Sequence, residues 1–335
     1  MTTQIAIIGL GQIGASIGLA LKKNKAPVSI IGFDKNIGVE KASVTLGVID
    51  EARRLPGAVR DADIVLLCLP LAEIKETLKL IGPALKEKAV VMDTAPIKSG
   101  LFESVKKYIP YGRFYLGLLP ALAPDFFASS ESGLNAADAK LFQRTVMVVD
   151  APPGTPLEVE QIAFDFIKLL GARPMHSDFT ESDGWMTSVH LLPQLAAMAV
   201  LDATVDNQGW QDARKFAGRP FAGVTGGLAY YDDAASLKEQ ALASRMSVIH
   251  ALDVLMASLK GLRDDLEKND DKSVAERLDY SFAARERWLD ERGAAEWLKE
   301  GGDTLELPDA SEQIRHMLFG STAVDRAKQK KKDSQ

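Results

Sequence analysis

The sequence has few of the residues that build disulfides and metal centres. Its 335 residues include one cysteine, Cys68, and four histidines. A single cysteine excludes an intramolecular disulfide and a thiolate zinc site. The four histidines are scattered without the spacing of metal ligands. We therefore expect no metal, and the apolar run around Cys68 predicts a buried thiol in a strand.

Long apolar runs and an excess of positive charge are also absent. No run approaches the ~20 residues that a membrane-spanning helix needs. The N-terminus enters an apolar segment without the basic region of a signal peptide. The net charge is -6 and the isoelectric point is about 5.4, which disfavours a nucleic-acid surface. We expect a cytoplasmic protein that binds neither membranes nor nucleic acid.

Short apolar segments alternate with helical periodicity in the first half of the chain. This alternation predicts a doubly wound, mostly parallel α/β sheet of the Rossmann type in a domain of residues 1–180. The predicted strands are 4–8, 28–33, 63–69, 89–93, 114–118, 145–149 and 172–176. The predicted helices are 12–23, 37–46, 72–86, 98–108, 135–143 and 157–170.

Helical periodicity dominates residues 181–320 and predicts an all-α domain. We expect a helix over 183–207 that Pro193 kinks, and a long helix over 236–268. The apolar face of so long a helix needs a partner helix, from the same chain or from a second subunit. A further helix over 273–299 is expected to bury Leu278, Phe282, Trp288, Leu289 and Trp297. The basic stretch 321–335 predicts a disordered tail.

The segment from Gly9 to Gly14, Gly-Leu-Gly-Gln-Ile-Gly, matches G-x-G-x-x-G and joins a predicted strand to a predicted helix. Gly9 permits the tight turn, Gly11 lets a pyrophosphate approach the backbone, and Gly14 lets the helix pack on the strand. The pyrophosphate would rest on the amides that begin the helix. These include the amides of Gln12 and Ile13, so the motif predicts a dinucleotide site rather than an empty glycine turn.

Asp34 ends the next predicted strand at the distance expected for a ribose-binding carboxylate, about 20 residues after the glycines. A carboxylate there accepts hydrogen bonds from ribose hydroxyls and repels a 2′-phosphate. The predicted cofactor is therefore NAD. Lys35 follows directly and offers a positive charge to a phosphate, so NADP stays open as an alternative.

Several segments together resemble the prephenate and arogenate dehydrogenase family. The helix start, the Pro-containing turn after the third strand and an Asp-x-x-x-x-Lys segment are similar to the family's, as are several later segments. The resemblance covers about residues 4–265. The segments that carry it are 11–18, 68–71, 93–98, 117–120, 132–142, 181–183 and 190–194.

The resemblance implies a Rossmann domain followed by a helical domain that dimerises. It implies an NAD(P)-dependent oxidative decarboxylation of prephenate or arogenate, toward tyrosine. It also implies cofactor contacts at Leu69, Pro70 and Thr94, and it makes Lys98 a catalytic candidate because the family has a lysine at that position.

The chain departs from the family on the substrate side. Leu119 stands where the family has the histidine of Gly-x-His-Pro, and Pro96 where it has a serine. A leucine accepts no proton, and general acid–base catalysis is worth about 10²–10⁴-fold. His190, on a predicted helix at the position of a family serine, is the remaining proton-transfer candidate. The alternative is a helix histidine with a local hydrogen bond.

A dicarboxylate such as prephenate needs fixed cations, and the family's substrate arginine falls near Thr225. We name Leu119, Arg219 and Arg245 as candidate substrate contacts. Three functions remain open at this point. They are a dehydrogenase of prephenate or arogenate, an oxidoreductase of the same scaffold with a less polar substrate, and an inactive NAD(H)-binding regulatory protein.

Overall fold

The structure is a computed structural model that describes residues 3–129, 131–230 and 233–298. The chain divides into two compact units, and the first ends at Ser182 while the second covers Asp183–Glu300. The boundary expected from the sequence, at residue 180, lies two residues earlier. The expected end of the helical domain, 301–320, and the expected tail, 321–335, lie outside the described residues.

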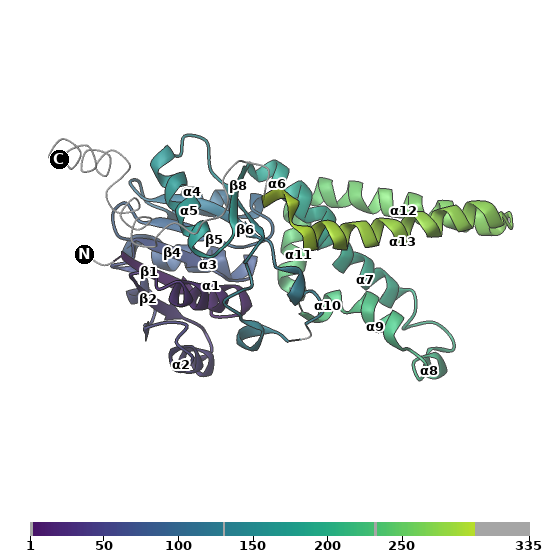
Figure 1. Ribbon diagram of the computed structural model, residues 1–335, viewed down its shortest axis with the longest axis horizontal. Helices are drawn as coiled ribbons and strands as arrows, with labels where there is room; N and C mark the ends of the chain where they lie inside the picture. Colours follow the sequence, from purple (N-terminus) through teal and green to yellow (C-terminus); the bar gives the residue numbers. More distant parts are fainter. Residues whose placement is uncertain (1–2, 130, 231–232, 299–335) are drawn as a thin grey trace. The chain divides into compact units, whose positions relative to one another are not determined.

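The first unit is built on an eight-stranded sheet with the order β3-β2-β1-β4-β5-β6-β7-β8 (Figure 1). All neighbouring strands run parallel except β6 and β7. The predicted mostly parallel sheet is therefore confirmed. The strands are β1 (Thr3–Ile8), β2 (Val28–Phe33), β3 (Glu51–Ala52), β4 (Ile64–Leu67), β5 (Val90–Asp93), β6 (Phe114–Pro120), β7 (Val146–Asp150) and β8 (Arg173–Ser177).

Alternate strand residues enter two cores on opposite faces of the sheet. On β1, Ile5 and Ile7 pack with residues of α1 (Gln12–Lys23) and α5 (Leu157–Leu169), whereas Ile8 packs with α3 (Leu71–Ile81). A strand buried on both faces is typical of parallel sheets. The sheet order turns from β1 to β2 on one side and to β4 on the other. Open α/β sheets bind ligands outside the carboxyl ends of the strands at such a point.

The helix predicted over residues 135–143 is wrong. The structure has only a 3₁₀ turn, η5 (Gly133–Ala136), followed by further turns. The Asp138 amide donates to Ser16 Oγ at 3.0 Å, and the Asp138 carboxylate accepts from the Lys140 amide at 2.7 Å. Such side-chain bonds compete with helical ones. The remaining helices of this unit are α2 (Ile37–Thr45), α4 (Phe102–Tyr108) and the start of α6 (Phe179–Met186).

The second unit is helical, as expected, but the single helix predicted over 236–268 is wrong. Two helices, α11 and α12, meet at Ser244 with a bend of 97°. Ser244 has φ -101° and ψ 30°, outside the α-helical region. Its side chain favours helix ends over helix interiors. The helices are α7 (Leu192–Asp202), α8 (Trp210–Ala213), α9 (Arg219–Thr225), α10 (Gly227–Tyr230), α11 (Ala234–Ala243), α12 (Arg245–Glu267) and α13 (Asp271–Ala294).

A π-helical turn, η6 (Thr187–Leu191), separates α6 from α7. Pro193 has no amide hydrogen, so the carbonyl of Val189 loses its α-helical partner. The Thr187 hydroxyl donates to the Asp183 carbonyl at 2.7 Å in the turn before. The kink predicted at Pro193 therefore takes the form of a widened turn, which is a frequent feature of functional sites.

The helical stretch Phe179–Asp202 is long and apolar enough by composition to cross a membrane. Its buried side carries the polar residues Asp183, Thr187 and Gln194. Polar side chains of this kind are costly in a bilayer unless they face protein or water. We therefore do not interpret the stretch as a membrane span.

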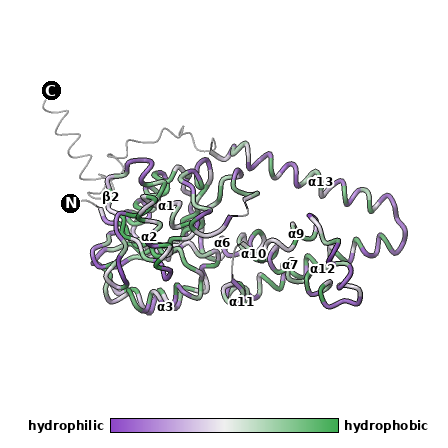
Figure 2. Tube along the Cα trace, turned by 90° about the horizontal axis from the view of Figure 1, so that it is seen from below, coloured by the Kyte–Doolittle hydropathy of each residue, from purple (hydrophilic) through white to green (hydrophobic). Residues whose placement is uncertain are grey.

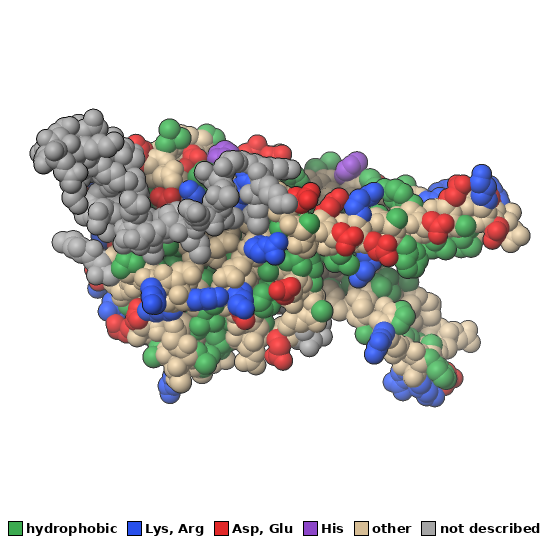
Figure 3. Space-filling model, in the orientation of Figure 1, with side chains coloured by type: hydrophobic (Ala, Val, Ile, Leu, Met, Phe, Trp, Pro, Cys, Tyr) green, Lys and Arg blue, Asp and Glu red, His purple; other side chains and the backbone are tan. Residues whose placement is uncertain are grey.

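The two long helices expose many of the apolar residues that the sequence assigned to a core. Met246 and Leu259 on α12 are 68% and 58% exposed, and Phe282 on α13 is 71% exposed. The expectation that Leu278, Phe282 and Trp288 are core residues is wrong for the single chain, because α12 and α13 contact each other along only part of their surfaces. Hydrophobic and hydrophilic segments alternate along α13 (Figure 2). Hydrophobic side chains lie among charged ones along this helix pair (Figure 3).

Candidate functional site

The glycine turn between β1 and α1 is held against the neighbouring strands. Gly9 has φ +93°, and its amide donates to the Phe33 carbonyl at 2.8 Å. A Cβ at Gly9 would lie 2.2 Å from the Cys68 carbonyl oxygen. Both the positive φ and this close approach require glycine.

The other two glycines of the motif have different surroundings. A Cβ at Gly14 would lie 2.0 Å from the Gly9 carbonyl oxygen and 3.1 Å from Ile7 Cγ2. A Cβ at Gly11 would meet no atom of the described residues within 4 Å. Gly9 and Gly14 therefore permit packing, whereas Gly11 borders open space at the place where a pyrophosphate would approach.

The start of α1 leaves its amides available to an anion. The helix begins at Gln12 after Gly11, which has no side chain to cap it, and its first turn has no acidic residue. The first amides of a helix have no partner within the helix and carry its positive dipole end. The predicted amides of Gln12 and Ile13 are thus suited to phosphate oxygens. The Gln12 side chain itself donates to the Ala136 carbonyl at 3.3 Å.

The Asp34 carboxylate is fixed at the carboxyl end of β2, beside this turn. One oxygen accepts from the Leu10 amide at 2.9 Å and the other from the Asn36 amide at 2.8 Å. A carboxylate has about four acceptor positions, so it keeps capacity for ribose hydroxyls. The Lys35 ammonium lies 2.5 Å from a Glu73 carboxylate oxygen. This ion pair favours NAD, because it partly neutralises the charge that a 2′-phosphate would need.

The predicted contacts at Leu69, Pro70 and Thr94 lie at the same edge of the sheet. Leu67 and Asp93 pair in register at the ends of β4 and β5, and the Thr94 amide donates to the Leu67 carbonyl at 3.1 Å. Pro70 precedes the first residue of α3. Between β4 and Leu69, burial raises the pKa of Cys68 to about 12. The thiol therefore stays neutral near pH 7, which suits a structural cysteine.

Lys98 lies in the interior next to this edge. Its side chain and that of Asp93 are both 0% exposed, and the Lys98 ammonium lies 2.9 Å from the Asp93 carboxylate. The ammonium also donates to the carbonyls of Asp93 at 3.1 Å and Leu118 at 2.9 Å. The Asp93 carboxylate accepts from the Tyr115 hydroxyl at 2.6 Å and from the Ala95 amide at 2.8 Å.

These contacts tie the end of β5 to β6. An ammonium has three donors, and three oxygen atoms accept from that of Lys98. The lysine stem passes over Gly117, where a Cβ would lie 2.9 Å from Lys98 Cε. The catalytic role of Lys98 stays a prediction, and its contacts favour a positioning role for the turn that follows Asp93. Sequence reasoning did not connect Tyr115 or Leu118 with Lys98, because β6 is distant from Lys98 in sequence and only the apolar character of these residues was visible.

The remaining predicted residues lie in two places. Leu119 is on β6, two residues beyond the Gly117 that pairs with Asp93, and is 7% exposed. His190 is half-buried on the π-helical turn, and its carbonyl accepts from Gln194 Nε2 at 3.1 Å. Arg219 and Arg245 begin α9 and α12 and are exposed. The structure thus brings together the residues predicted to bind the nucleotide, and the roles of all these residues and of the other four stay predictions.

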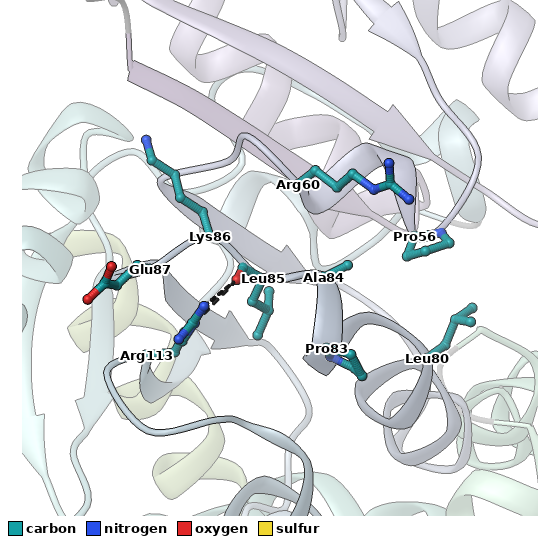
Figure 4. Close-up of a pocket in the computed structure, with 9 residues that line it drawn as sticks. All are labelled: Pro56, Arg60, Leu80, Pro83, Ala84, Leu85, Lys86, Glu87 and Arg113. Atoms are coloured by element: carbon teal, nitrogen blue, oxygen red, sulfur yellow. Dashed lines mark hydrogen bonds between the residues drawn. The ribbon is translucent and has the colours of Figure 1, made fainter.

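A surface pocket of about 620 Å³ lies elsewhere on the first unit (Figure 4). Arg113 points into it and donates to the Leu85 carbonyl at 3.0 Å. Lys86 and Arg113 precede β5 and β6, and Arg60 precedes β4. The pocket therefore lies at the amino ends of these strands, whereas α/β sheets bind ligands at the carboxyl ends. We do not assign the nucleotide to it.

The glycine turn predicts opposite outcomes for two small substitutions. Gly11→Ala is expected to leave unfolding in urea unchanged and to weaken NADH binding about tenfold or more, because the new methyl group occupies the approach of the pyrophosphate. Gly14→Ala is expected to lower the free energy of unfolding by about 1–3 kcal/mol through overpacking. Fluorescence titration and urea denaturation measure the two effects. Undiminished NADH binding by Gly11→Ala would contradict the proposed site.

The buried ion pair predicts a large effect of Lys98→Met on stability. We expect the free energy of unfolding to fall by about 3–5 kcal/mol, because the Asp93 charge stays buried without its cation. The double variant Asp93→Asn/Lys98→Met should lose less unfolding free energy than Lys98→Met alone, since it leaves no unpaired charge. Lys106→Met on the exposed side of α4 is the control and should change stability by less than about 0.5 kcal/mol. Equal losses in the two lysine variants would refute the assignment.

Comparisons with known proteins identify relatives of this chain. Residues 17–175 match the family model of the prephenate dehydrogenase nucleotide-binding domain. The cyclohexadienyl dehydrogenase of Zymomonas mobilis is 24% identical over 284 residues, which are 84% of this chain and 94% of that protein. The prephenate dehydrogenase of Lactococcus lactis is 30% identical over 200 residues, which are 59% of this chain and 53% of that protein.

Solved structures show the same fold. The prephenate dehydrogenase of Aquifex aeolicus, in complex with hydroxyphenyl propionate and NAD+, aligns with a TM-score of 0.75 at 21% identity. The alignment covers 86% of this chain and 98% of that one. With the family model matched on residues 17–175, the first unit carries the nucleotide-binding domain of the prephenate dehydrogenase family.

Proposed function

We propose that this chain, an NAD-dependent dehydrogenase of the prephenate dehydrogenase type, catalyses the oxidative decarboxylation of prephenate or arogenate. One observation carries the proposal. The glycine turn, the open start of α1 and the fixed Asp34 carboxylate meet at one edge of the sheet, in a unit that matches the nucleotide-binding domain of this family. NAD bound there would supply the hydride acceptor.

The reaction needs a group that accepts a proton. The ring carbon that bears the hydroxyl gives up hydride, the hydroxyl gives up its proton, and the ring carboxylate leaves as carbon dioxide while the ring becomes aromatic. The resulting phenolate oxygen then takes a proton back to give the phenol. Leu119 has no atom that accepts the proton. We propose His190 for this role, because a neutral imidazole has a ring nitrogen that accepts a proton and because its π-helical turn is typical of functional sites.

The substrate also needs partners for its ring and its carboxylates. We propose that Leu119 contacts the ring and that Arg219 and Arg245 bind carboxylate oxygens. Both arginines are exposed at the first position of a helix. A guanidinium binds a carboxylate with two parallel hydrogen bonds, so either arginine is able to replace the arginine that the family has near Thr225.

Turnover tests the proposed function. Purified protein with NAD is expected to form NADH, followed at 340 nm, when prephenate or arogenate is added. His190→Asn should lower kcat by about 10²–10⁴-fold, the typical share of general base catalysis. His250→Asn, on the exposed surface of α12, is the matched control and should keep the parent rate.

Two outcomes would separate the parts of this proposal. NADH binding without turnover of either substrate would refute the activity and favour a regulatory NAD-binding protein. Full activity of His190→Asn would refute only the role of that histidine.

We further propose that the chain forms a homodimer through α12 and α13. Each helix has 23 or 24 residues and is therefore about 35 Å long. Monomers rarely expose apolar patches larger than a few hundred Å², and a second copy offers the same helices as a cover. The exposed apolar residues are Met246, Ile249, Val254, Met256, Leu259, Leu266, Leu278, Tyr280, Phe282 and Trp288.

Light scattering coupled to gel filtration tests the dimer. The parent chain is expected to elute with twice the mass of 36.3 kDa. Leu259→Glu with Phe282→Glu should give the single mass, because two charges would be buried without partners. Val44→Glu, an exposed apolar position on α2, is the control and should stay dimeric. A parent protein of single mass would refute the dimer.

A further inference from the structure

The buried face of α11 is polar along most of its length. Ser236, Gln240 and Ser244 are spaced by four residues, so they lie on one side of the helix. Their exposed fractions are 0%, 0% and 7%. Leu237, 8% exposed, is the apolar residue beside them. We call Ser236, Gln240 and Ser244 the polar stripe of α11.

The polar stripe is short of hydrogen bonds within the part of the chain that the structure describes. Neither Oε1 nor Nε2 of Gln240 has a partner among the described residues, and the same holds for the hydroxyls of Ser236 and Ser244. The start of the helix is well satisfied in comparison, since Asp233 accepts from the Ser236 amide at 2.7 Å. A buried polar group without a partner is destabilising. The hydrogen-bond partners of the stripe are therefore expected to come from a molecule other than the described part of the chain.

The neighbours of α11 point to a ligand. The helix packs against the π-helical turn that carries His190 and against α12. The stripe therefore belongs to the helix that adjoins the proposed proton acceptor, within the same unit. Buried polar groups without partners, on a helix that packs against the turn of the proposed proton acceptor, are candidates for contacts with a ligand.

The chemistry of the stripe selects the ligand group. A carboxamide offers two donors and an acceptor, and each hydroxyl offers one donor and an acceptor. The stripe contains no cation, so a lone carboxylate would be poorly stabilised there. An α-amino acid group matches better, because its ammonium donates to Gln240 Oε1 and a serine hydroxyl while its carboxylate accepts from Gln240 Nε2.

We propose that Gln240, with Ser236 or Ser244, binds the α-amino acid end of the substrate and so makes arogenate the preferred substrate over prephenate. Four residues span about 6 Å along a helix, so one ligand group contacts Gln240 together with one of the serines. That the ligand is a substrate rests on the proposed function. The competing explanation is ordered water alone.

Two small probes isolate the ammonium group. L-tyrosine and 3-(4-hydroxyphenyl)propionate share the ring and the carboxylate, and only L-tyrosine has the α-ammonium. Calorimetry on NAD-loaded protein is expected to show that Gln240→Leu raises the Kd for L-tyrosine about tenfold, which corresponds to the loss of one or two hydrogen bonds. The Kd for 3-(4-hydroxyphenyl)propionate should change less than about twofold. Gln211→Leu, exposed on α8, is the matched control and should change neither Kd.

Several results would overturn the proposal. They are an equal increase in the Kd values of both probes in Gln240→Leu, an unchanged Kd for L-tyrosine, or no binding of L-tyrosine to the parent protein. An unchanged Kd with a raised Tm would show that the stripe holds water only. Should Gln240→Leu not fold, the double variant Ser236→Ala/Ser244→Ala replaces it. This variant is likewise expected to raise the Kd for L-tyrosine more than the Kd for the propionate.

Turnover separates this proposal from the proposed function. If Gln240→Leu selectively weakens L-tyrosine but neither prephenate nor arogenate is oxidised, the binding site stands and the activity fails. If both substrates are oxidised and Gln240→Leu raises both KM values equally, the activity stands and the role of Gln240 fails.

Discussion

The close approach of the glycine turn to its neighbouring strands is the constraint on which the nucleotide site depends. The Gly9 amide bonds to the last residue of β2, and its α-carbon lies against the carbonyl that follows β4. Because Gly14 then packs directly on Gly9, α1 starts at the point where the sheet order reverses. Asp34 bonds to the Leu10 amide from the adjacent strand. The positions of the α1 amides, which are predicted to bind phosphate, and of the Asp34 carboxylate, which is predicted to bind ribose, are therefore set by the packing of the backbone.

Local signals explain how much of the fold the sequence predicted. The central strands β1, β4 and β5 were predicted correctly because each is an apolar run that is largely buried on both faces. The short strand β3 was missed because Glu51 and Ala52 form no apolar run. The glycine turn was predicted correctly because the tight turn and the close packing require glycine. The helix over 135–143 failed because Asp138 and Ser16 make a tertiary hydrogen bond instead. The helix over 236–268 failed because a bend at a single residue, Ser244, leaves the apolar spacing on either side nearly unchanged.

The catalytic half of the site could not be derived in the same way. Lys98 was named because the family has a lysine at that position, but its acceptor Leu118, and Tyr115, which donates to the same Asp93, come from another strand. Gln240 was hidden within a segment whose apolar spacing dominated the prediction. Its spacing from Ser236 and Ser244 was visible, but a surface face of a helix has the same pattern. Only burial and the lack of partners among the described residues distinguish it.

The π-helical turn has a consequence for alignment with relatives. Such a turn contains one residue more than an α-helical turn, and one residue rotates a helix by about 100°. The side of α7 that is buried is therefore out of phase with α6. Any relative whose helix is regular here matches this chain only if one residue between Thr187 and Leu191 is left unpaired. A gap-free alignment would pair His190 with a residue that faces a different direction.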